Sequence, residues 1–509
     1  MSDWSMEPAA AWVPCDLQLA TEASVCSTGL PVEYASTEIS GNCLQPYVPA
    51  YKQLVEHEVA REYDPVEKAG QEFMVDLYNM EKISRNPFLV LKEVADEYKV
   101  DIDMMAQRIH RYPASIQAIG LNERYTVPMV VSIGPYHHGR EHLKKAEKVK
   151  HVAAYNCIKI SGCLVEEMYA TVVQVAHCAR NLYDNEVMAG ISLHDDFLPM
   201  MFLDACFLVQ YMLSMSPDSS VEIDDVLLSS FFDSNDNEIY HDIMLLENQL
   251  PWPVVEAVMK FVKVPLDQFI NSFKGCLQDR KDKLEWKTPV GNYEDPPHLL
   301  GLLRFHIVGE NRTQTDTKPE ISSISFSISA VELAEIGVTL KPSETSEISY
   351  MGLKTTGTLF AELSLAPLTL DSARASWLIN MAAHELCTTP NFHAAEDEES
   401  AVCSYLLLLA MLVDREEDVQ ELRTKGLLQG GGGLNNRDAL DFLTSVQSLR
   451  LGSCYVRIME DIETYRMTRR TRTNVHAFFH RNIKIVAAIL SAIVTVVSIL
   501  GTLISLKNS

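Results

Sequence analysis

The chain has 509 residues, 47% of them hydrophobic and 22% charged, which is typical of a globular protein with a sizeable core. The formal net charge of −26 argues against a nucleic acid as the partner, because phosphates repel an acidic surface. The eleven cysteines include no C-x-x-C pair. That pattern favours buried thiols in a reducing compartment over a disulfide framework.

The first 65 residues are rich in Ser, Thr, Glu and Pro and show weak periodicity, which predicts a poorly ordered arm. They contain no apolar stretch of the kind found in a signal peptide. Helical spacing begins near Val66, and we expect one body from 66 to 465. The expected fold is mainly α (α+β): a large helical body with a small β-rich insertion near 321–370.

A first motif, SIGPYHHG, follows a short β-branched run at 130–133. Its residues are Ser132, Ile133, Gly134, Pro135, Tyr136, His137, His138 and Gly139. Adjacent histidines on a strand or turn point in different directions, so this pair is poorly suited to holding one metal ion. We therefore interpret the pair as structural turn histidines and expect neither a metal nor a cofactor.

Helical spacing returns from 143 to 183, and the stretch from Phe197 is apolar on nearly every side, which predicts a buried helix. Asp204 lies within it and needs a partner there. A second motif interrupts another apolar run, and its residues are Leu246, Glu247, Asn248, Gln249, Leu250 and Pro251. Its polar residues favour a network that joins helices, with a catalytic carboxylate as the alternative.

Short alternating runs at 321–370 predict three or four strands around one helical segment. The apolar stretch 401–413 is too short to cross a bilayer and predicts a core helix. Residues 426–436 contain four consecutive glycines, which predicts a flexible loop. One amphipathic helix is expected from about Arg437 to Tyr465.

The C-terminal region combines a basic stalk, 466–484, with an uncharged run from Ile485 to Leu506. Twenty-two helical residues extend about 33 Å, enough to cross a hydrocarbon core of about 30 Å. This predicts a single-pass, tail-anchored transmembrane helix. The stalk's charges favour a cytoplasmic body and contact with anionic lipid headgroups. They are Arg466, Arg469, Arg470, Arg472, Arg481 and Lys484.

Several motifs occur in one order with this hydrophobic tail: IHRYPASI at 109–116, SIGPYHHG, FLDACFLVQ at 202–210, LLENQLP, HLLGLLR at 298–304 and NMAAHELC at 380–387. In this combination the chain, from about residue 70 onward, resembles the plant family called domain of unknown function 247, or UPF0481, and its grass-type members most. The resemblance implies a plant membrane protein with a mostly helical body. It supplies no catalytic residues, because the family has no established activity, and it associates some grass members with self-incompatibility.

These observations predict a non-enzymatic protein that binds an unidentified protein partner at a membrane surface. One alternative is a hydrolase that uses His137, His138 and Glu247, which requires those side chains to meet within hydrogen-bond reach. The other is an outward-facing recognition domain, which would carry a glycan at the Asn311 sequon.

Overall fold

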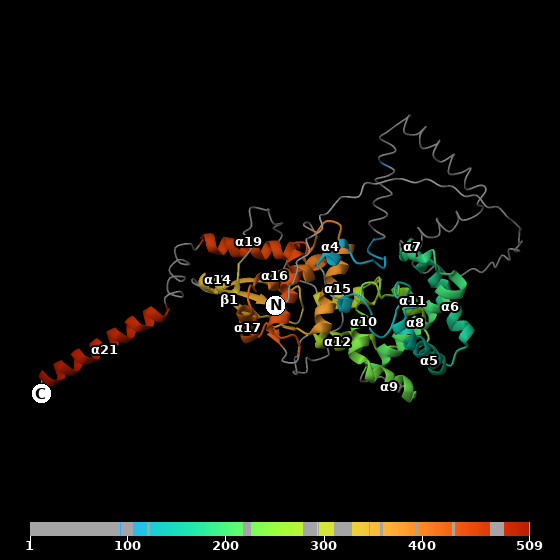
Figure 1. Cartoon of the computed structure of the whole chain (residues 1–509), viewed down its shortest axis with the longest axis horizontal. Helices are drawn as coiled ribbons and strands as arrows, with labels where there is room; N and C mark the ends of the chain where they lie inside the picture. Colours follow the sequence, from blue (N-terminus) through green and yellow to red (C-terminus); the bar gives the residue numbers. More distant parts are fainter. Residues whose placement is uncertain are drawn as a thin grey trace, which may run out of the picture. The chain divides into compact units, whose positions relative to one another are not determined.

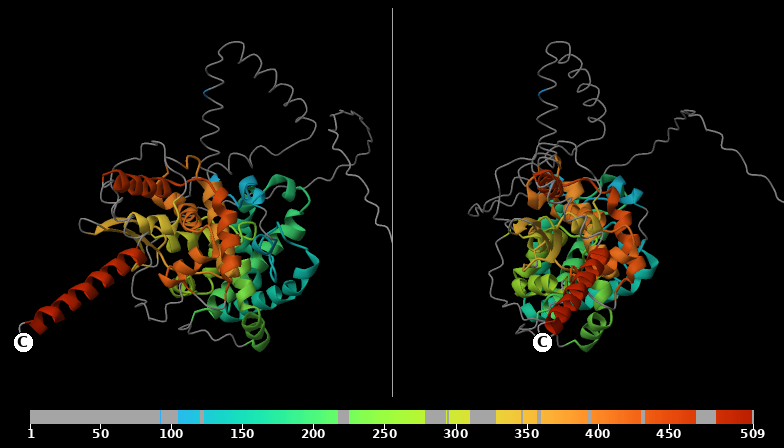
Figure 2. Two further views of the ribbon diagram at one scale, coloured as in Figure 1. Left: turned by 60° about the vertical axis from the view of Figure 1, so that its left-hand side comes forward. Right: turned by 90° about the vertical axis from the view of Figure 1, so that its left-hand side faces the viewer.

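The structure is a computed structural model, shown in Figures 1 and 2. It describes Lys92, Tyr293 and residues 105–119, 123–216, 225–277, 295–309, 328–345, 347–356, 360–392, 395–429, 433–468 and 483–507. The predicted arm at 1–65 and the Asn311 sequon lie outside these ranges. The described residues all belong to one unit of the chain, Ala50–Ser509. Most of them are helical, which confirms the predicted mainly α fold.

The first group of helices surrounds α8, Leu198–Ser214. Helices α5, Lys144–Ser161, α6, Val165–Ala179, and α11, Trp252–Met259, all pack against it. A π-helical turn precedes α8, and together they form the apolar helix Leu193–Ser214. Among the described residues, this helix alone is long and apolar enough to cross a membrane, yet 83% of its apolar window is buried. It is the predicted core helix.

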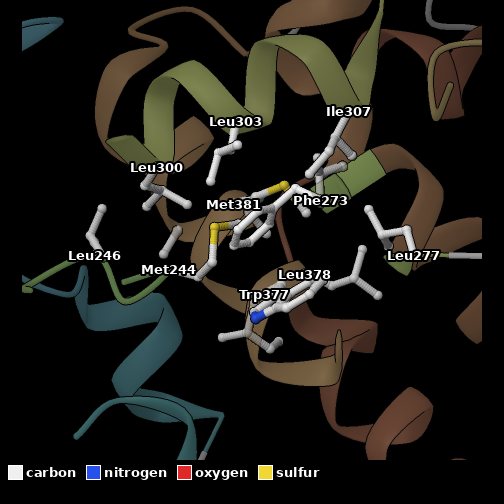
Figure 3. Close-up of a cluster of buried hydrophobic side chains, with 14 of the residues drawn as sticks. Met244, Leu246, Phe273, Leu277, Leu300, Leu303, Ile307, Trp377, Leu378 and Met381 are labelled. Carbon is white, nitrogen blue, oxygen red and sulfur yellow. The ribbon is translucent and has the colours of Figure 1, made fainter. Parts of the chain in front are cut away.

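A second group consists of α12, Leu266–Cys276, α13, Leu299–Val308, and α15, Ser372–Thr388. Figure 3 shows their apolar side chains meeting, with Phe273 and Trp377 facing residues that follow α10, Asp236–Asp242. The ring centroids of Phe273 and Trp377 lie 5.3 Å apart. The core is therefore continuous with the segment that carries the second motif.

The predicted β-rich insertion is confirmed over its described part. It contains α14, Ala330–Glu335, and a three-stranded sheet of order β1-β3-β2. Strand β1, Val338–Pro342, runs parallel to β3, Phe360–Leu365, and β2, Gly352–Thr356, is antiparallel to β3. A fourth strand, β4, Leu368–Thr369, pairs with β5, Leu428–Gln429. Part of the predicted glycine-rich loop is therefore held as a strand.

The C-terminal part of the body contains α16, Ala401–Met411, α17, Glu416–Thr424, α18, Asn436–Ser445, and α19, Ser453–Thr468. Helix α16 is fully buried, as predicted. The single helix predicted over 437–465 is wrong, because the chain becomes extended at Leu449 and starts a new helix at Ser453. This break brings the Gly452 backbone against α16.

The remaining short elements connect these groups. They are α4, Ala114–Ala118, η1, Glu123–Tyr125, η2, Glu141–Leu143, η3, Arg180–Leu182, α7, Asn185–Met188, η4, Leu193–Phe197, α9, Val226–Ser234, η5, Asp397–Ser400, and η6, Val446–Ser448.

The last element is α21, Ile483–Lys507, which matches the position of the predicted tail helix. Its apolar side chains are exposed, with Ile493 at 53% and Val497 at 62%. The stretch with described side chains, Ala487–Leu500, is shorter than a membrane span. Its insertion in a bilayer therefore stays a prediction.

Gly452→Ala tests the break before α19. A Cβ there would lie 2.2 Å from Ser404 Oγ and 2.7 Å from the Ser400 carbonyl oxygen. We expect a loss of about 1–3 kcal/mol in the free energy of unfolding, measured by urea denaturation, because the packed α16 cannot easily move. Gly352→Ala is the control, since its Cβ would meet nothing within 4 Å. Equal effects at both glycines would contradict this account.

Candidate functional site

The segment 126–140, which carries the first motif, contains neither helix nor strand. Its buried N–H groups therefore need acceptors from elsewhere. The Asp242 carboxylate, at the end of α10, accepts three consecutive backbone N–H groups at 2.7, 2.7 and 2.8 Å, those of Met129, Val130 and Val131. The β-branched run therefore makes its hydrogen bonds with a side chain instead of a neighbouring strand.

The neighbouring His241 side chain contacts both Asp242 and a further backbone carbonyl. Its Nδ1 atom lies 2.9 Å from Asp242 Oδ1, and its Nε2 atom lies 2.6 Å from the carbonyl oxygen of Arg124. Both ring nitrogens face oxygen acceptors in the interior. The pair therefore joins the end of α10 to the chain that leads into the first motif.

Asn248 of the second motif makes the next hydrogen bonds along this segment. Asn248 Oδ1 accepts the Ile133 N–H at 2.7 Å, and its Nδ2 donates to the Val131 carbonyl at 3.1 Å. Asn248 is fully buried. One amide side chain thus satisfies a donor of the first motif and an acceptor just before it, which explains why two segments about 115 residues apart pack as a unit.

Gly134 lies against the backbone of the second motif. Its φ is +74°, and a Cβ there would lie 2.6 Å from the Gln249 carbonyl oxygen. Its N–H donates to Asp204 Oδ2 at 2.8 Å. Both its left-handed backbone and its surroundings therefore require glycine.

Asp204 has the partner that its burial requires. Lys150, with no exposed surface, lies 2.6 Å from Asp204 Oδ1 and 2.7 Å from Glu147 Oε1. It also donates to Ser132 Oγ at 3.2 Å. Burial by itself would lower the pKa of Lys150, but the two carboxylates more than offset this, so its pKa is raised. A lysine that keeps its proton cannot activate Ser132 as a nucleophile.

Gln249 and Glu247 fix further segments. Gln249 Oε1 accepts the N–H of Leu300 at the start of α13, at 3.0 Å. Glu247 Oε1 accepts the Tyr112 N–H at 2.9 Å and lies 3.1 Å from Arg111 Nε. All three polar residues of the second motif therefore bind other segments, as the interpretation of a joining network predicted.

The three residues of the hydrolase hypothesis do not assemble. His137 is buried with its Nε2 3.9 Å from Glu247 Oε2, beyond hydrogen-bond reach, whereas His138 is exposed. Burial, with help from Arg140 and Arg111, lowers the pKa of His137 to about 3, so its ring is neutral at neutral pH. The geometric condition set for this hypothesis is not met.

Two further polar anchors were missed from the sequence, although both lie in the NMAAHELC segment. Asn380 Oδ1 accepts the Tyr112 hydroxyl at 2.6 Å and the Leu246 N–H at 2.8 Å. Glu385 accepts the N–H groups of Val402 and Cys403, at the start of α16, at 2.8 and 2.9 Å. A polar residue inside an apolar helical run is the signal that marks both positions in the sequence, as it does for Asp204.

A buried histidine pair was also missed. The rings of His298 and His384 meet edge to face with centroids 5.1 Å apart. Burial lowers the pKa of His298 to about 3 and that of His384 well below its usual value. Within the described part of the chain, no group of three or more His, Cys, Asp or Glu side chains could hold a metal ion.

The structure describes only part of the predicted stalk. Arg466 is the last arginine of α19, and its guanidinium lies 3.7 Å from Glu463. Lys484 belongs to the first turn of α21. The other four arginines, Arg469, Arg470, Arg472 and Arg481, lie outside the described residues.

Comparisons with known proteins agree with the motifs. A family model described as a plant protein of unknown function, DUF247, matches residues 109–497. A UPF0481 protein of Arabidopsis thaliana is 26% identical over 389 residues, which cover 71% of this chain and 75% of the relative. No solved structure gives a significant match.

Asp242→Asn tests the carboxylate anchor. The amide would turn donors toward backbone donors, so we expect a loss of about 2–4 kcal/mol in the free energy of unfolding by urea denaturation. Asp233→Asn, at an exposed position on α9, is the matched control and should change it by less than about 0.5 kcal/mol. A neutral result at Asp242 would mean that its hydrogen bonds contribute little.

The buried histidines predict acid sensitivity. Unfolded histidines take up protons near pH 6.5, whereas His137 and His298 stay neutral in the folded state until about pH 3. The unfolded chain binds more protons in this window, so stability falls as pH falls from 6.5 toward 3. Each histidine contributes up to about 1.4 kcal/mol per pH unit. Urea denaturation across this range should show a smaller slope for His298→Gln, and an unchanged slope would contradict the assignment.

Proposed function

Because this chain belongs to the DUF247 family of plant proteins, we propose that it is a tail-anchored membrane protein whose helical body binds other proteins and performs no catalysis. Two features support the proposal: the apolar tail helix, and the use of the buried polar residues as structural anchors.

The tail helix supports the membrane part of the proposal. Between Ile485 and Leu506 there is no charged residue, and exposed apolar side chains on α21 would otherwise face water. The stalk places six lysines and arginines before the span, and no aspartate or glutamate lies between Glu463 and the span. This cluster of positive charge favours a cytoplasmic body and attraction to anionic headgroups.

The polar network carries the non-enzymatic part of the proposal. The carboxylates of Asp242, Asp204 and Glu385 are each occupied by backbone N–H groups. A catalytic carboxylate needs an oxygen that can reach a substrate. In this protein these oxygens hold segments together, so the body is built to present a rigid surface. Recognition of the self-incompatibility type, which the family resemblance suggests, is one use of such a surface.

A carbonate wash of isolated membranes tests the anchor. We expect the full chain to stay in the membrane and Ile493→Asp/Val497→Asp to release it. Each carboxylate at the centre of a span costs about 2.5–3.5 kcal/mol on the insertion scale. Thr495→Val, at the same depth, is the control and should stay bound. Wild-type protein in the soluble fraction would overturn the anchor.

Glycosidase treatment tests the orientation. A cytoplasmic body leaves Asn311 without glycan, so its band should not shift. A sequon placed on an extension after Ser509 should gain a glycan, because that end would be lumenal. The opposite pattern would support the outward-facing alternative.

A further inference from the structure

Helix α5 lies at the edge of the body in Figure 1, and its outer side chains are exposed. Its inner side packs on α8 through small buried residues such as Ala146 and Ala153. The outer side chains recur every three or four residues and therefore share one side of the helix. We call the set the α5 basic face: Lys144, Lys145, Lys148, His151 and Tyr155, all exposed.

The charge of this region is opposite to that of the whole chain. Between 140 and 162 there are six lysines and arginines and two glutamates, whereas the chain carries −26. The inward-facing pair, Lys150 and Glu147, is neutralised within the network around Asp204. Glu141 pairs with Lys144 at an exposed position, where ion pairs are weak. Lys145 and Lys148 therefore contribute most of the net positive charge on the outer side of α5.

We propose that the α5 basic face binds an acidic, extended segment of a partner protein. The proposal rests on the proposed function and specifies the chemical class of the protein partner. A helix of 18 residues is about 27 Å long, which matches a short peptide segment. Three exposed lysines lie at the start of α5, at 144, 145 and 148, and the exposed Lys159 lies near its end. Together they steer and orient an acidic chain.

Tyr155 adds an apolar contact surface to the lysines of the face. Its side chain is 68% exposed and lies at the end of the face, between Lys148 and Lys159 along the helix. Leu164, 71% exposed, and Val165, 46% exposed, continue the apolar surface at the end of the helix. Exposed aromatic residues beside a charged rim are typical of the residues that dominate interface energies. The partner segment should therefore carry an apolar residue between its acidic ones.

The size and place of the face argue against other anionic partners. A nucleic acid or a bilayer extends well beyond 27 Å and would meet the acidic remainder of the body. Figures 1 and 2 place α5 and α19 at opposite ends of the body.

Fluorescence anisotropy with a labelled acidic peptide tests the proposal. The probe is about 18 residues of Glu and Ala with one central Phe, titrated with the full chain in phosphatidylcholine nanodiscs, whose bilayer carries no net charge. We expect Lys145→Glu/Lys148→Glu to weaken binding about tenfold or more, and Tyr155→Ala about threefold. The matched control is Lys260→Glu/Lys263→Glu, two exposed lysines after α11, which should change binding less than about twofold.

Equal losses in the two double variants would overturn the proposal, as would no loss in either or no binding by the wild type. So would a loss confined to phosphatidylserine vesicles or to a single-stranded oligonucleotide of similar length. Far-UV circular dichroism of each variant separates lost binding from lost folding, and Tyr155→Ala tests the face without a charge change. Carbonate extraction tests the anchor independently, so the two proposals can fail separately.

Discussion

The body depends on buried side chains that take the place of secondary structure as acceptors of backbone N–H groups. The segment from Met129 to Gly134 has no neighbouring strand, yet Asp242, Asn248 and Asp204 accept its donors in turn. An unpaired buried N–H would cost about 1–3 kcal/mol. These side chains therefore decide whether an irregular segment can lie inside the core at all.

Buried side chains also accept backbone N–H groups where other segments meet. Glu385 receives the first N–H groups of α16 and pairs with Arg304, and Asn380 joins the 109–113 loop to Leu246. Glu385 therefore holds α15 to α16 and α13, and Asn380 holds α15 to the segment of the second motif. The oxygens that make these contacts are occupied within the body.

Buried charges and exposed charges are arranged differently in this body. Inside, Lys150 is balanced by Asp204 and Glu147, so the interior carries paired charge. Outside, the acidic surface is interrupted at α5, where the lysines face water. An acidic molecule therefore carries a short basic helix face at α5, and the proposed acidic segment is complementary to it in charge.

The helical class, the buried α8 and α16, the strands of the insertion and the joining role of 246–251 could all be predicted from the amino-acid sequence. Apolar periodicity and polar interruptions of apolar runs are local signals, and these features depend on them. The break at Gly452 and the pairing of β5 with β4 were decided only by the tertiary structure, because distant residues impose both. The partners of Asp242 and the separation of His137 from His138 were decided in the same way, since sequence spacing does not report which segments meet across the core.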